Sequence, residues 1–155
     1  MTVADKLVEL LKAKELTCAT AESCTGGGVG SAITAVPGSS AVFAGGVISY
    51  ANEVKRDVLG VSDHDLQTVG AVSPEVAAQM AAGARKLLGT DLAVSLTGIA
   101  GPDGGSAEKP VGLVWFGLAT KDGVRTEKVI FSGDRARVRE QAVTHALGML
   151  TIAAM

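Results

Sequence analysis

The chain of 155 residues contains few aromatic side chains, two cysteines and two histidines. Aromatic residues make up 3% of the sequence and hydrophobic residues 47%, so we expect a core of alanine, valine, leucine and isoleucine. Cys18 and Cys24 are too few for a disulfide framework and are expected to be reduced thiols. The isolated histidines, His64 and His145, make a poor metal site, and we expect neither a metal nor another cofactor.

The sequence also lacks a long apolar run and an excess of charge of one sign. No stretch of about 18 uninterrupted apolar residues is present, which excludes a typical membrane span. The formal net charge of -2 provides no broad positive surface for a nucleic acid or an anionic membrane. The first residues form an amphipathic segment with early acidic residues, unlike a signal peptide. These features predict a soluble, cytoplasmic protein.

The order of the apolar segments predicts a single α/β domain over residues 1–155. Helical spacing or capping signals cover residues 3–15, 29–36, 73–88 and 134–152. Short apolar runs typical of strands cover residues 16–21, 41–50, 91–96, 111–119 and 124–131. A turn signal at residues 121–123 predicts that the last two strands form a hairpin. We therefore expect a three-layer α/β/α domain with a mixed, mostly parallel sheet.

The most informative segment is residues 20–28, TAESCTGGG, which follows the first predicted strand. It presents Ser23 where glycines open a helix, so a hydroxyl lies beside unpaired backbone N–H groups that can bind an oxyanion or a phosphate. The pattern indicates a nucleophile turn for acyl transfer; a helix-capping serine and a Cys24 nucleophile are the alternatives. The glycines complete neither a dinucleotide fingerprint nor a P-loop.

A serine nucleophile needs a base, and neither histidine is well placed for that role. His64 lies in a polar stretch, and His145 is expected to point away from the apolar stripe of the last helix. Lys55, just after the second strand, is the remaining candidate if burial or a positive neighbour lowers its pKa. An exposed lysine on a charged helix is the alternative. Lys109, before a later strand, is a weaker candidate base.

Other polar residues follow the predicted strands. If these strands are parallel, their carboxyl ends share one edge of the sheet, which brings Tyr50 and Thr97 toward the serine and the lysine. The loop 97–105 is so rich in glycine that its backbone can approach a ligand closely, although a strained turn is the alternative. Three arginines crowd the start of the last helix against its dipole, and we interpret Arg137 as a clamp for a phosphate or a carboxylate.

Four segments together resemble the CinA C-terminal domain family, the nicotinamide-nucleotide amidases of the PncC type. They are TAESCTGGG at 20–28, GVISYANEVK at 46–55, LTGIAGPDGG at 96–105 and KPVG at 109–112. The resemblance spans nearly the whole chain in the family's order. It implies hydrolysis of the carboxamide of nicotinamide mononucleotide to nicotinate mononucleotide and ammonia. Two-part members of the family carry an extra N-terminal nucleotide-processing domain. No such domain precedes these segments in the sequence, so we expect the stand-alone form.

Carried over residue by residue, the resemblance implies Ser23 as the nucleophile and Lys55 as its general base. Tyr50 matches a position that relays or positions a proton, and Thr97 and Arg137 match further supporting positions. The positions implied in binding the substrate or its oxyanion through the backbone are Cys24, Thr25, Gly26, Gly27, Gly98 and Gly101. We expect a small-molecule substrate and a homo-oligomer. The alternative is a non-catalytic module that binds a nucleotide or a partner protein, since the family name comes from competence and DNA damage.

Overall fold

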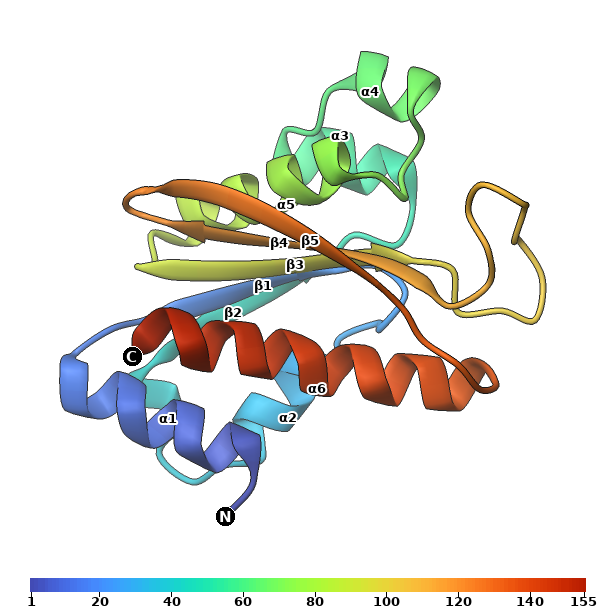
Figure 1. Cartoon of the computed structure of the whole chain (residues 1–155). Coiled ribbons are helices and arrows are strands. Elements are labelled where there is room, and N and C mark those ends of the chain that lie inside the picture. Colours follow the sequence, from blue (N-terminus) through green and yellow to red (C-terminus); the bar gives the residue numbers. More distant parts are fainter.

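The protein, described here by a computed structural model of residues 1–155, is a five-stranded sheet between two layers of helices (Figure 1). Helices α1, α2 and α6 lie on one face, whereas α5 packs on the other face with α3 and α4 on its side. The strands are β1 (Cys18–Glu22), β2 (Phe43–Ile48), β3 (Leu92–Gly98), β4 (Leu113–Thr120) and β5 (Gly123–Ile130). The helices are α1 (Val3–Lys14), α2 (Gly28–Thr34), α3 (Asn52–Leu59), α4 (Asp63–Thr68), α5 (Pro74–Leu88) and α6 (Arg135–Ala154), with a 3-10 turn at Ser39–Ala41.

The strands follow the order β2-β1-β3-β4-β5 across the sheet. Strand β1 pairs in parallel with β2 and β3, whereas β4 pairs antiparallel with β3 and β5. Four strands therefore run in one direction and β4 runs against them, which confirms the predicted mixed sheet and its hairpin. Because β1, β2 and β3 are parallel, the chain leaves all three at the same edge of the sheet.

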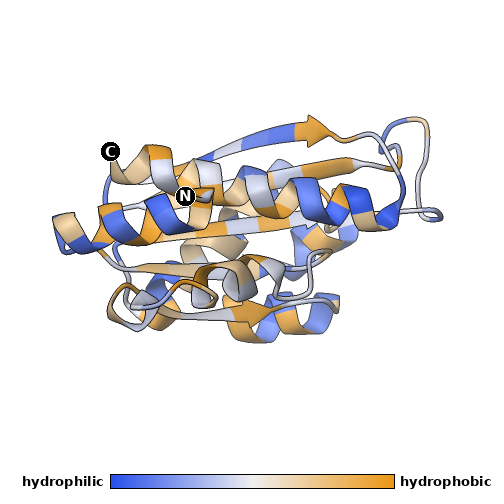
Figure 2. Cartoon of the chain, turned by 90° about the horizontal axis from the view of Figure 1, so that it is seen from below, coloured by the Kyte–Doolittle hydropathy of each residue, from blue (hydrophilic) through white to orange (hydrophobic).

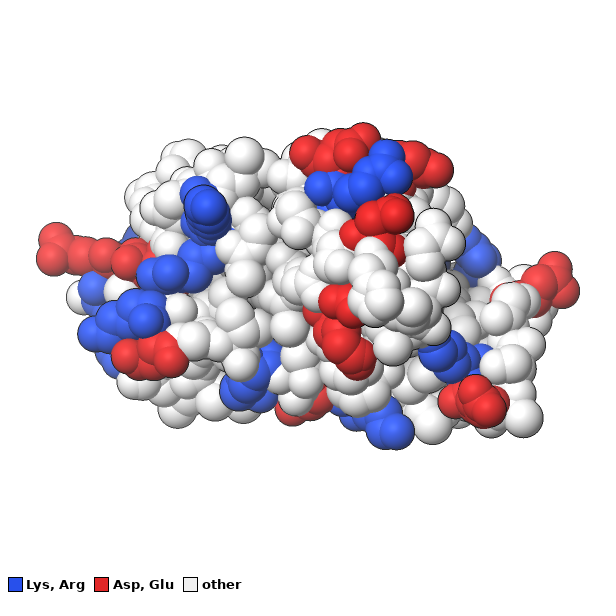
Figure 3. Space-filling model, turned by 90° about the horizontal axis from the view of Figure 1, so that it is seen from above, with Lys and Arg blue, Asp and Glu red and all other residues white.

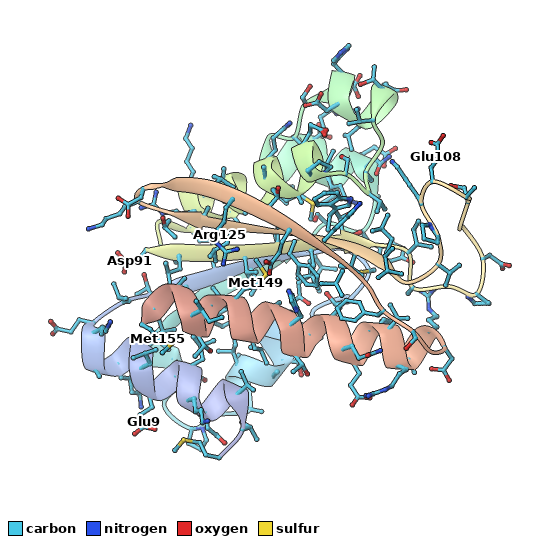
Figure 4. The ribbon with its side chains drawn as sticks, viewed as in Figure 1. Glu9, Asp91, Glu108, Arg125, Met149 and Met155 are labelled. Carbon is cyan, nitrogen blue, oxygen red and sulfur yellow. The ribbon has the colours of Figure 1, made fainter.

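Two hydrophobic cores fill the space between the layers. The larger core lies under α1, α2 and α6 and includes Leu7, Phe116 and Leu150, all fully buried. In Figure 4, Met149 points from α6 toward the sheet. The smaller core, under α5, is rich in alanine, which lets α5 lie close enough for the Ser95 hydroxyl to donate to its Ala77 carbonyl. The central strands are mostly apolar, whereas hydrophilic residues recur along α1, α6 and β5 (Figure 2).

The structure contains two helices, α3 and α4, for which the sequence pattern gave no bounds, although a charged helix around Lys55 was one alternative. Helices α5 and α6 begin at residues whose side chains cap the first turn, Ser73 and Asp134. Helix α3 begins after Ala51, which has no side chain that can cap, so its start carries no sequence signal. On the face seen in Figure 3, basic and acidic side chains are intermixed. No helix combines the length and the apolar character needed to cross a bilayer.

The close packing of α3 on α5 depends on Gly83. A Cβ atom at this position would overlap the Leu59 carbonyl oxygen at the end of α3, whereas a Cβ at Gly148 of α6 would meet no atom within 4 Å. We expect Gly83→Ala to lower the free energy of unfolding by about 1–3 kcal/mol. The matched variant Gly148→Ala should raise it by about 0.5–1 kcal/mol, because alanine favours a helix. Urea unfolding measures both values, and a stabilising Gly83→Ala would contradict this account of the packing.

Candidate active site

The segments that follow β1, β2 and β3 meet in one cleft at the carboxyl edge of the sheet. Its free volume of about 290 Å³ is at the small end of the range for ligand sites. The long loop between β3 and β4 forms one wall, and its Glu108 points outward into solvent (Figure 4). The cleft is lined by Ser23, Cys24, Tyr50, Asn52, Lys55, Ala71, Val72, Thr97, Gly98, Ile99, Ala100, Gly101, Asp103, Gly104 and Arg135.

Ser23 and Lys55 are in direct contact in this cleft. Their Oγ and Nζ atoms lie 3.2 Å apart, although the residues are 32 positions apart in the sequence. Both side chains are buried, with exposed fractions of 8% for Ser23 and 1% for Lys55. Ser23 directly follows β1, and Lys55 lies in the first turn of α3 on the opposite side of the cleft. The fold therefore brings together a hydroxyl and an amine with the spacing of a nucleophile and its base.

The surroundings of the Lys55 amine favour its neutral form. Burial lowers its pKa from the ordinary lysine value of 10.5, and no carboxylate forms an ion pair with it. The backbone carbonyl oxygens of Ser49 and Tyr50 lie 2.8 Å and 3.1 Å from Nζ. A neutral amine has two N–H groups for these two carbonyls, and its lone pair then accepts the Ser23 hydroxyl proton.

The turn after β1 leaves three backbone N–H groups without a partner. The Gly26 N–H donates to the Ser23 carbonyl, and the Gly28 N–H donates to the Thr25 carbonyl. The N–H groups of Cys24, Thr25 and Gly27 make no hydrogen bond within the protein. Gly26 and Gly27 have φ angles of 58° and 100°, in the left-handed region that favours glycine. The turn can therefore offer backbone donors beside Ser23, and Gly26 is not among them.

A fully buried carboxylate, Glu22, occupies the start of α2. Its oxygens accept hydrogen bonds from the N–H groups of Val29 and Gly30, at 2.9 Å and 3.1 Å, and from the Thr25 hydroxyl, at 2.6 Å. The expectation that N–H groups at the helix start are open to an oxyanion or a phosphate is therefore wrong for Val29 and Gly30, whereas the N–H groups of Cys24, Thr25 and Gly27 keep no partner. The available signal was a lone acidic residue in an otherwise uncharged strand.

The Cys24 thiol does not have the properties of a nucleophile. It is buried, and burial raises its pKa to about 11, so the thiol is protonated at neutral pH. Arg139, from α6, donates instead to the backbone carbonyls of Cys24 and Thr25, at 3.0 Å and 3.3 Å. This geometry favours the Ser23 hydroxyl over the Cys24 alternative.

Tyr50 and Thr97 both line the cleft but do not bond to the Ser23 hydroxyl. Tyr50 is 63% exposed at the mouth of the cleft, and only its backbone carbonyl bonds to Lys55. The Thr97 hydroxyl is buried and donates to the Ala71 carbonyl, at 3.0 Å. Gly98 and Gly101 supply backbone to the same wall, and Gly101 has a φ of 85°.

The arginines at the start of α6 lie in different places. Arg137, the predicted anion clamp, pairs with Glu140 at 3.2 Å and lines a separate hollow beside α6. Arg135 lines the cleft instead, where it donates to the Gly101 carbonyl at 2.8 Å and lies 3.5 Å from the Tyr50 hydroxyl. The structure therefore places Arg137 outside the cleft and Arg135 at its mouth.

The remaining candidate bases lie away from Ser23. Lys109 donates to the Val69 carbonyl, and His64 lies on α4, outside the cleft. His145 bonds to Glu127 at 2.8 Å and packs against Phe116. The expectation that His145 points away from the apolar side of α6 is wrong, because its ring faces the sheet. No three histidine, cysteine, aspartate or glutamate side chains gather in an arrangement that could hold a metal ion.

Comparisons with known proteins give matches over almost the entire chain. The family model for the CinA C-terminal domain matches residues 1–153. The chain is 50% identical over 151 residues to the nicotinamide-nucleotide amidohydrolase PncC of Escherichia coli K12, covering 97% of this chain and 92% of that protein. It is 56% identical over 136 residues to a putative competence-damage inducible protein of Halothermothrix orenii, covering 87% of this chain. The chain spans about a third of the length of that second relative, 33%.

Solved structures share the fold. The competence/damage inducible protein CihA from Agrobacterium tumefaciens has a TM-score of 0.95 and 44% identity, with 98% of this chain and 93% of that chain covered. A competence or damage-inducible protein from Enterobacter asburiae has a TM-score of 0.94 and 33% identity, with 100% and 99% covered. The three-layer architecture is therefore that of these proteins.

The Ser23–Lys55 contact predicts how the reactivity of the serine depends on pH. Labelling of Ser23 by a fluorophosphonate should accelerate as pH rises, because only neutral Lys55 accepts the hydroxyl proton. Since burial lowers the Lys55 pKa, the midpoint should lie below 10.5. Lys55→Met should be labelled slowly, without this rise. Mass spectrometry of the labelled protein measures the rate, and a midpoint at or above 10.5 would contradict the assignment of Lys55.

Proposed function

Because the chain belongs to the CinA C-terminal domain family, we propose that it hydrolyses the carboxamide of nicotinamide mononucleotide to nicotinate mononucleotide and ammonia. The observation that carries this proposal is the buried Ser23–Lys55 contact beside unpaired backbone N–H groups. This arrangement suits acyl transfer from an amide, because it combines a nucleophile, a base and donors for the developing negative charge. The substrate is thus a small molecule, and the proposed reaction uses no cofactor.

The first half of the proposed reaction forms an acyl-enzyme. Neutral Lys55 takes the Ser23 proton as Oγ bonds to the carboxamide carbon, and the carbonyl oxygen becomes an oxyanion. Protonated Lys55 then gives its proton to the amide nitrogen, and the C–N bond breaks to release ammonia. In the second half, Lys55 takes a proton from water, and the resulting hydroxide attacks the ester. Lys55 then returns this proton to the Ser23 oxygen as nicotinate mononucleotide leaves.

Backbone donors of the turn stabilise the oxyanion in this proposal. The N–H of Cys24 follows the nucleophile directly, a position that supplies an oxyanion donor in other serine hydrolases. Thr25 and Gly27 offer further N–H groups with no partner in the protein. Each well-placed donor contributes roughly 3 kcal/mol to transition-state stabilisation. The side chain of Cys24 has no part in this step.

Arg135 is the arginine best placed for the substrate phosphate. Its guanidinium lines the cleft and bonds to only one carbonyl at short range, so it keeps N–H groups for a phosphate. Tyr50 lies beside it at the mouth, where its exposed ring can cover a bound ligand. A supporting role for Arg137 stays a prediction from the resemblance. A homo-oligomeric state and a cytoplasmic location stay predictions from the sequence.

Removal of either reacting group should abolish amide hydrolysis. Ser23→Ala should reduce ammonia release from nicotinamide mononucleotide by at least about 10³-fold, and Lys55→Met by about 10²–10⁴-fold. Ser39→Ala removes a buried serine elsewhere, and Lys121→Met an exposed lysine, so both should keep full activity. Full activity of Ser23→Ala would exclude the nucleophile. Calorimetric binding of pyridine nucleotides without turnover in the unmodified chain would favour the binding-module alternative.

The two arginines should differ in their effect on phosphate recognition. Arg135→Gln should raise KM for the mononucleotide by about 10-fold and leave KM for the riboside unchanged, because only the mononucleotide has the charged group. Arg137→Gln should change neither value if its side chain stays paired with Glu140 outside the cleft. Steady-state ammonia assays with both substrates measure these constants. The reverse pattern would assign the phosphate to Arg137.

A further inference from the structure

We propose that Glu22 is a positioning residue, whose buried carboxylate fixes the Ser23 turn so that its backbone donors stay in place for the oxyanion. This role deepens the proposed amide hydrolysis and rests on it. Glu22 does not reach the Ser23–Lys55 pair, so it acts through the backbone that carries Ser23 rather than on the substrate. It lies directly before the nucleophile, as the last residue of β1.

The contacts of the carboxylate are all with the turn and the helix that follows it. Oε1 accepts from the Thr25 hydroxyl and the Val29 N–H, and Oε2 accepts from the Gly30 N–H. The residue is 1% exposed, and no lysine, arginine or histidine forms an ion pair with it. An unpaired buried carboxylate is stable only if donors satisfy it, and here three donors from residues 25–30 do so.

Helix α2 depends on this carboxylate because it has no cap of its own. Its N-cap residue is Gly27, which lacks a side chain and has a φ of 100°. Two of the first N–H groups of the helix therefore need an acceptor from elsewhere, and a strand residue supplies it. These hydrogen bonds connect the two ends of the turn. The carboxylate belongs to Glu22, just before Ser23, and it binds the N–H groups of α2 just after Gly28.

The turn is also held from α6. Arg139 donates to the Cys24 carbonyl, and a trans peptide plane orients the following Thr25 N–H in the opposite direction. Arg139 also donates to the Thr25 carbonyl. Glu22 thus accepts hydrogen bonds from donors of the turn and of α2, while Arg139 donates hydrogen bonds to two backbone carbonyls of the turn. What remains unpaired is the set of N–H groups of Cys24, Thr25 and Gly27.

The variant Glu22→Gln tests this role because it preserves the size of the side chain. It replaces one carboxylate oxygen with an amide NH₂ group, which cannot accept a hydrogen bond from the N–H group that it faces. We expect kcat for ammonia release to fall by about 10- to 100-fold with KM changed less than twofold, since the turn serves the transition state. Thr25→Val removes only the hydroxyl contact and should lower kcat by a smaller factor, about 3- to 10-fold. Glu9→Gln, on the exposed side of α1, should match the unmodified chain.

Two further readouts separate this inference from the proposed function. Hydrogen exchange at the Val29 and Gly30 amides should accelerate in Glu22→Gln more than exchange across the β3–β4 pair. Labelling of Ser23 by a fluorophosphonate, which needs no amide substrate, should slow in parallel with kcat. If the unmodified chain has no amidase activity, the proposed function fails while these readouts still test Glu22.

Folded Glu22→Gln protein with unchanged labelling and unchanged amide exchange would overturn the positioning role. A KM increase with constant kcat would also overturn it, because it would indicate a role in ground-state binding. If Glu22→Gln does not fold, Thr25→Val decides: normal labelling and turnover of that variant contradict the proposal, and a parallel loss of both supports it.

Discussion

The site depends on one constraint, the burial of the Lys55 amine without a carboxylate to pair with it. A charged amine in such a place is strongly disfavoured, so the fold shifts the group toward its neutral form. Two backbone carbonyls and one hydroxyl then satisfy it, and the hydroxyl belongs to Ser23. The amine is held there by α3, which packs on α5 where Gly83 leaves room for the end of α3. Reactivity at one edge of the sheet is therefore coupled to helix packing on one of its faces.

A second constraint fixes the other half of the site. The turn at residues 23–27 contains left-handed glycines and has few bonds of its own, so by itself it could adopt several conformations. Glu22, from β1, accepts from the Thr25 hydroxyl of the turn and from the Val29 and Gly30 N–H groups of α2. Arg139, from α6, donates to the Cys24 and Thr25 carbonyls of the turn. These two side chains have opposite charges and come from different elements, yet they form no ion pair with each other. Each instead restrains the backbone, which preorganises donors before a substrate arrives.

Much of this architecture follows from the sequence, because apolar runs and turn residues mark the five strands and four of the helices. The Ser23 turn and the convergence of Tyr50, Lys55 and Thr97 on one cleft follow from parallel strands. Helix α3 carries no such mark, since Ala51 has no side chain that can cap it. The burial of Lys55 was not predictable either, because a lysine is usually found exposed. Helical spacing alone did not separate Arg135 from Arg137, because their orientation depends on where the long loop of the β3–β4 connection lies. Glu22 was not predicted, although it is a lone acid in an otherwise uncharged strand, because a glutamate is usually found exposed.

The period of the strand explains why an acid can lie next to the nucleophile without disabling the base. Successive residues of β1 point to opposite faces, so Glu22 faces α2 on one side of the sheet while Ser23 faces α3 on the other. A carboxylate on the Lys55 side would form an ion pair and raise the pKa of the amine, which would keep it protonated and unable to act as a base. On the α2 side, helical N–H groups bind the carboxylate and the sheet separates it from the amine. Glu22 and Ser23 thus supply a fixed turn and a reactive hydroxyl only in this strand register. A shift of β1 by one residue would exchange the faces of these two side chains and abolish both roles.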